Sequence, residues 1–83
     1  MNDIYDLINE KAFSSYSDKI EKDEMGKWVI HWFTVAKNLE NDYKLSGKYM
    51  MEKKVKIAYQ KHLKTFSNET QKFICENVHL NGV

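Results

Sequence analysis

With 83 residues and a net charge of +1, the chain suits one small domain with a single core and is too short for two. One cysteine excludes a disulfide framework, and the absence of arginine weakens any site that needs a bidentate guanidinium. The absence of proline permits long helices, and two tryptophans, five tyrosines and four phenylalanines supply area for a compact core.

The first residues and the longest apolar run bear on where the protein is found. The stretch from Met1 to Asp6 is acidic and has no basic or apolar region of the kind that makes a secretory signal. The apolar run from Trp28 to Ala36 is interrupted by His31 and is too short to span a bilayer. A single cysteine suits a reducing compartment. We therefore expect a cytoplasmic protein without a membrane segment.

The N-terminal segment has the spacing of an amphipathic helix. Asn2 or Asp3 can cap it, and acids in its first turn complement the helix dipole. The serine-rich stretch 14–17 predicts a break. The apolar residues at steps of three and four are Ile4, Leu7, Ile8 and Ala12.

A second helix is predicted to begin near Ser17 and to continue past residue 43. Gly26 lies inside it and marks a kink, a boundary between two helices or a close contact. Residues 29–35 are rich in β-branched and aromatic side chains, so a short strand is the competing prediction, although helix is preferred. Glu40 and Lys44 stand at i,i+4, which predicts a solvated face. The apolar stripe is Ile20, Met25, Trp28, Val29, Trp32, Phe33, Ala36, Leu39 and Tyr43.

Two further helices are predicted after Ser46-Gly47, which ends the second one. Ser67 is the expected N-cap of the last helix, and the tail from Asn77 to Val83 is expected to fray, with Asn81-Gly82 as a turn. The third stripe is Met51, Val55, Ala58, Tyr59, His62, Leu63 and Phe66, and the fourth is Phe73, Ile74 and Val78. The pattern predicts one all-α domain over 1–83: a small irregular bundle of four helices, or five if Gly26 divides the second.

Catalytic and metal sites find little support in the sequence. Cys75 and His79 stand at i,i+4 and could share a metal with His31 or His62, but no second closely spaced pair accompanies them. We therefore expect neither metal nor cofactor, and both inner histidines are expected to bond to backbone. The chain contains no glycine loop and no nucleophile or metalloprotease motif, so an enzyme is not expected.

The lysine-rich third helix gives one functional hypothesis. Residues 43–83 carry eight lysines against three acids, whereas residues 1–42 carry five lysines against nine acids. Lysines near exposed tyrosines could hold RNA or single-stranded nucleic acid. A helix-turn-helix is rejected, because the last two helices are expected to meet within two residues and the last carries Lys72 alone. The candidate lysines are Lys53, Lys54, Lys56, Lys61 and Lys64.

The aromatic residues give the leading hypothesis. A chain of this size cannot bury all of its aromatics, so some should form a surface that binds a host or cognate protein, with a homodimer as a further option. Short, lysine-only, proline-free chains without enzyme motifs resemble, in style, the small proteins of bacteriophages and other AT-rich mobile elements. That resemblance implies an inhibitor or regulator that occludes a host protein surface. The candidate partner-binding residues are Trp28, Trp32, Tyr43, Tyr49, Lys48 and Lys53.

Overall fold

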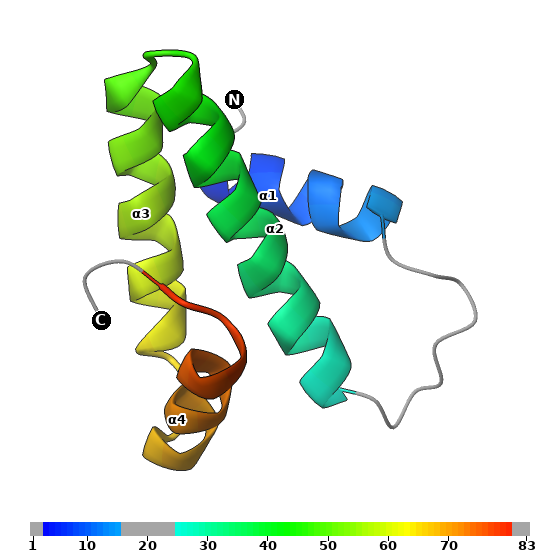
Figure 1. Ribbon diagram of the computed structural model, residues 1–83. Coiled ribbons are helices and arrows are strands. Elements are labelled where there is room, and N and C mark those ends of the chain that lie inside the picture. Colours follow the sequence, from blue (N-terminus) through cyan, green and yellow to red (C-terminus); the bar gives the residue numbers. More distant parts are fainter. Residues whose placement is uncertain (1–2, 16–24, 81–83) are drawn as a thin grey trace.

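A computed structural model describes residues 3–15 and 25–80 of the chain. It contains four helices in the described residues, α1 (Ile4–Ser15), α2 (Met25–Leu45), α3 (Tyr49–Leu63) and α4 (Asn68–Asn77), and no strand there (Figure 1). The predicted small all-α bundle is confirmed. The expected helix start near Ser17 and the expected turn at Asn81-Gly82 lie outside the described residues.

The centre of the fold is an antiparallel hairpin of α2 and α3. Figure 1 shows the two helices side by side, with α1 crossing α2 and α4 below them at the opposite end from the α2–α3 turn. Gly47 makes this turn with a φ of 74°, in the left-handed region that a residue without Cβ adopts most readily. The Lys48 amide then donates to the Tyr43 carbonyl at 2.8 Å, which closes the end of α2 as predicted for Ser46-Gly47.

The segment 29–35 is helical, so the competing strand prediction is wrong. It lies within α2, which runs without a break from Met25 to Leu45, and Gly26 does not divide it. A Cβ added at Gly26 would lie 3.6 Å from the Phe73 ring, an ordinary contact distance. The helix prevails over the β propensity of this stretch because it buries one face against α1 and α3.

One apolar core joins all four helices. Its members follow the predicted stripes, and Val78 extends the core beyond the end of α4, where Leu80 also packs against it. None of the helices in the described residues has the length and apolar character that crossing a membrane requires. The buried apolar residues are Ile8, Ala12, Trp32, Phe33, Ala36, Leu39, Val55, Tyr59, Leu63, Ile74 and Val78.

Side chains close the ends of α1 and α4. Asp3 Oδ1 accepts a hydrogen bond from the Asp6 amide at 2.9 Å, and Ser67 Oγ accepts one from the Thr70 amide at 3.3 Å. The predicted break at residues 14–17 starts too early, because α1 still includes Ser14 and Ser15. The hydroxyl groups of both serines donate back to the Lys11 carbonyl, a bond that a helix accommodates.

The connection between α3 and α4 is longer than expected. α3 ends at Leu63 and α4 begins at Asn68, so four residues separate them instead of two. Residues 64–66 continue in turns, with the Lys64 amide donating to the Gln60 carbonyl. The prediction of a connection too short for a helix-turn-helix is therefore wrong, although α4 still carries Lys72 as its sole basic residue.

Candidate functional site

Trp32 belongs to the core and not to a partner-binding surface, which corrects the sequence prediction. Its side chain is 2% exposed and its indole Nε1 donates to Asn9 Oδ1 on α1 at 2.7 Å. Its ring lies 5.3 Å from that of Tyr5 and 4.4 Å from that of His62. The crossing of α1 over α2 covers this position, which the spacing in α2 alone could not reveal.

Trp28 lies far from the predicted partner-binding residues at the end of α2 and the start of α3. It is half-buried near the start of α2, where its ring packs 4.8 Å from that of Phe13, a side chain that is itself 69% exposed. Fifteen residues separate it from Tyr43, which corresponds to about 22 Å along the helix axis. The structure therefore does not bring the six predicted residues together on one surface.

The remaining four predicted residues lie around the α2–α3 turn. Tyr43 is half-buried, whereas Lys48, Tyr49 and Lys53 are exposed. Beside them are two exposed apolar residues, Leu45 and Met50, which the sequence prediction missed. The signal was present: Leu45 immediately precedes the Ser46-Gly47 stop, and Met51 rather than Met50 follows the buried stripe of α3. We define the tip as Leu45, Tyr49 and Met50 with the lysines Lys44, Lys48 and Lys53.

The large apolar side chains of the tip are mostly exposed to solvent. Leu45 is 83% exposed, Met50 is 77% exposed and Tyr49 is 69% exposed. They flank a single turn of the chain, with two lysines directly beside them in sequence. Isolated apolar residues on a surface are ordinary, but a cluster rimmed by charge is typical of an interaction site.

The four lysines of α3 and Lys64, directly after its last residue, share one side of the helix. Lys53, Lys54, Lys61 and Lys64 are exposed and Lys56 is half-buried. At 100° per residue, these five positions fall within an arc of about 160°. Of the tyrosines expected to assist in stacking, Tyr59 is fully buried and Tyr43 is half-buried, so Tyr49 is the remaining exposed aromatic near them.

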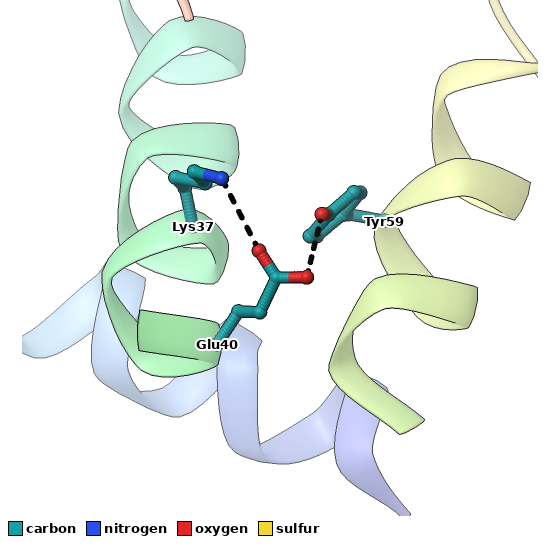
Figure 2. A network of polar contacts seen from close by, with 3 residues as sticks. All are labelled: Lys37, Glu40 and Tyr59. Carbon is teal, nitrogen blue, oxygen red and sulfur yellow. Dashed lines mark hydrogen bonds and ion pairs between the residues drawn. The ribbon is translucent and has the colours of Figure 1, made fainter. Parts of the chain in front are cut away.

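A buried carboxylate links α2 to α3 (Figure 2). Glu40 is 3% exposed; its Oε2 accepts from the Tyr59 hydroxyl at 2.9 Å, and its Oε1 lies 3.4 Å from Lys37 Nζ. The predicted solvated face is therefore wrong at Glu40, whereas Lys44 is exposed as expected. A buried carboxylate requires hydrogen-bond partners, and Tyr59 provides one. Because Tyr59 lies on α3, the spacing of residues within α2 could not indicate this contact.

The two inner histidines make different contacts. His31 Nε2 lies 3.0 Å from the Ala12 carbonyl oxygen, which confirms the expected bond to backbone. His62 instead pairs with a side chain, because its Nδ1 lies 3.1 Å from the Tyr5 hydroxyl. Desolvation by burial lowers the pKa of His62. Burial, with a smaller contribution from nearby Asp3, raises the pKa of Tyr5. Tyr5 therefore remains a phenol through neutral pH.

A groove of about 570 Å³ lies where the start of α1 meets the outer side of α3. Asp3, Ile4 and Tyr5 line it from the α1 side. The α3 side consists of Lys54, Ile57, Ala58, Lys61 and His62, with Thr65 just beyond the helix. We call this feature the α1–α3 groove. It combines apolar walls with two lysines, a composition suited to ligand binding that sequence reasoning did not identify.

The Cys75 and His79 pair does not have the geometry of a metal site. α4 ends at Asn77, and Val78 has extended backbone, so the two residues do not share a helix face. In residues 3–15 and 25–80, no three histidine, cysteine or acidic side chains are grouped to hold a metal ion.

No match to this chain is found among protein-family models, curated proteins or solved structures.

Proposed function

We propose that the chain is a non-enzymatic protein-binding module that acts as a small regulator or inhibitor by covering a surface of another protein with its tip. The observation that carries this proposal is the exposure of Leu45, Tyr49 and Met50, between 69% and 83%. Burying these side chains against a partner would stabilise a complex, because their apolar surface stays in contact with water in the folded chain.

The charges around the tip favour an acidic partner. Lys44, Lys48 and Lys53 are exposed, and Asp42 is the exposed acid closest to them in sequence. Lysines at the rim of an apolar contact speed association with an acidic surface and disfavour basic ones. We further propose that this is a cytoplasmic protein of the phage or mobile-element type that acts on a host protein. The basis is its short, lysine-only and proline-free sequence.

Affinity purification from the native host tests the proposal. The full chain should recover a protein partner whether or not nuclease is added. The triple variant Leu45→Ser, Tyr49→Ser, Met50→Ser should lose that partner, because it removes the apolar contact while leaving the core intact. Phe73→Ser is the matched control, since Phe73 is a 44% exposed aromatic at the other end of the bundle. Unchanged recovery by the triple variant would contradict the proposal.

The alternative function is binding of RNA or single-stranded nucleic acid by the lysines of α3. The observation that favours it is the arc on which Lys53, Lys54, Lys56, Lys61 and Lys64 lie. The observation against it is the burial of Tyr59, which removes one expected stacking partner. Measuring the affinity of the chain for RNA and single-stranded DNA at increasing salt concentrations tests this alternative. The affinity should fall steeply with salt if the lysines neutralise phosphates. No binding at low salt would exclude this alternative.

A further inference from the structure

The α1–α3 groove exposes apolar surface in a concave setting. Ile57 is 43% exposed although it lies on α3 beside the half-buried Ala58, and Ile4 faces the groove from α1. A volume of about 570 Å³ falls within the range of roughly 300–1,000 Å³ typical of small-ligand sites. The groove shares no residue with the tip, so it does not depend on the tip's proposed role.

The charges that line the groove favour an anion. Lys54 and Lys61 are two helical turns apart, about 10.5 Å along the axis of α3. In the part of the chain that the structure describes, neither groove lysine forms an ion pair. Asp3 is the opposing acid, but its Oδ1 already accepts from the Asp6 amide. The lining therefore carries two positive charges against one negative charge.

His62 adds a hydrogen-bonding group to the lining. When the Tyr5 hydroxyl donates to Nδ1, the neutral ring carries its proton on Nε2. In the described residues Nε2 has no hydrogen-bond partner, so it remains available as a donor. Aromatic neighbours hold the ring in place, with the Phe33 ring stacked 5.5 Å away and the Phe66 ring edge-on at 5.1 Å.

We propose that the α1–α3 groove binds a small carboxylic acid with an apolar body. The apolar part lies against Ile4, Ile57 and Ala58, and the carboxylate interacts with Lys54 or Lys61. A carboxylate suits the site better than a phosphate, because the net charge of the lining is small and lysine offers no planar fork for several oxygens. His62 donates a further hydrogen bond to the acid.

Titration of the ¹⁵N-labelled full chain with octanoate, below the concentration at which it forms micelles, tests the proposal. Saturable shifts of amide signals should be confined to residues 3–5 and 54–65. Octylammonium and octanol have the same chain with a positive or no charge, and each should bind at least several-fold more weakly. The double variant Lys54→Gln, Lys61→Gln should reduce octanoate affinity about threefold to tenfold, as expected for exposed charge pairs.

Two further variants control for general charge effects. Lys11→Gln with Lys72→Gln removes the same charge from exposed positions outside both the groove and the tip and should leave octanoate affinity unchanged. Asp3→Asn retains a capping side chain and should raise the affinity by removing the opposing acid. The absence of saturable shifts, equal binding of octanoate and octylammonium, or shifts centred on residues 45–50 would each overturn the proposal.

Discussion

The centre and the tip of the α2–α3 hairpin reverse the usual distribution of polar and apolar groups. At the centre, Glu40 and the hydroxyl of Tyr59 are buried and bonded to each other. At the tip, Leu45 and Met50 are the two most exposed large apolar side chains of the described residues. The same two helices thus enclose a carboxylate and expose aliphatic side chains within a few residues of each other.

This difference indicates that the centre of the hairpin stabilises the fold, whereas the tip is free for binding. A buried polar group is retained only if its partners are in place, so changes at the centre should be costly. An exposed apolar side chain contributes little to folding, so changes at the tip should be cheap. Four stability measurements test this difference between the centre and the tip.

The largest effect is expected for Trp32→Ala at the centre. Removing the buried indole leaves a cavity and takes away the hydrogen-bond donor to Asn9 Oδ1. The substitution should cost about 3–5 kcal/mol in the free energy of unfolding. Urea denaturation followed by far-ultraviolet circular dichroism measures it. Trp28→Ala is the control, with a smaller expected loss because Trp28 is half-buried. Equal losses would show that both tryptophans contribute to one core.

A smaller loss is expected for Tyr59→Phe. The substitution leaves the buried carboxylate of Glu40 without one hydrogen bond and should reduce the free energy of unfolding by about 1–3 kcal/mol. Adding Glu40→Leu to Tyr59→Phe should restore part of that loss, because the charge that needs partners is gone. A double-mutant cycle on denaturant midpoints gives the coupling. Additive losses would show that the two side chains do not interact.

A pH-dependent loss of stability should follow from His62. Burial lowers the pKa of His62, so the folded chain takes up this proton less readily than the unfolded chain. Its contribution should be complete above the ordinary histidine pKa of about 6.5 and should decline as pH falls from there through the lowered pKa. His62→Gln can still accept a hydrogen bond from Tyr5 but cannot titrate. Identical acid sensitivity of both proteins, measured by urea denaturation, would exclude His62 as the cause.

The smallest effect is expected at the tip. Each of Leu45→Ser, Tyr49→Ser and Met50→Ser should change the free energy of unfolding by no more than about 0.5 kcal/mol. Thermal denaturation of each single variant provides the measurement. A loss comparable to that of Tyr59→Phe would mean that the tip supports the fold, and the comparison between the two regions would fail.

Much of the fold could be predicted, because helical periodicity is a local property. The stripes of α2 and α3 identified Phe33, Val55 and Tyr59 as inward-facing, and the Ser67 cap was identified by its position before an acidic turn. The candidate site was less predictable. Tyr49, Lys48 and Lys53 were predicted as partner-binding residues, but in one set with Trp28 and Trp32, because the sequence does not show which of these residues share a surface. Leu45 and Met50 were missed because an apolar residue at a helix end fits a core equally well.

The all-α class and the turn at Gly47 could be predicted from the sequence. Those features depend on spacing within one segment and on the backbone freedom of a single residue. Three features could not: the cover of Trp32 by α1, the burial of Glu40 against Tyr59, and the groove between the start of α1 and α3. The physical reason is that each depends on where a second helix lies, and that position follows from packing of the whole core.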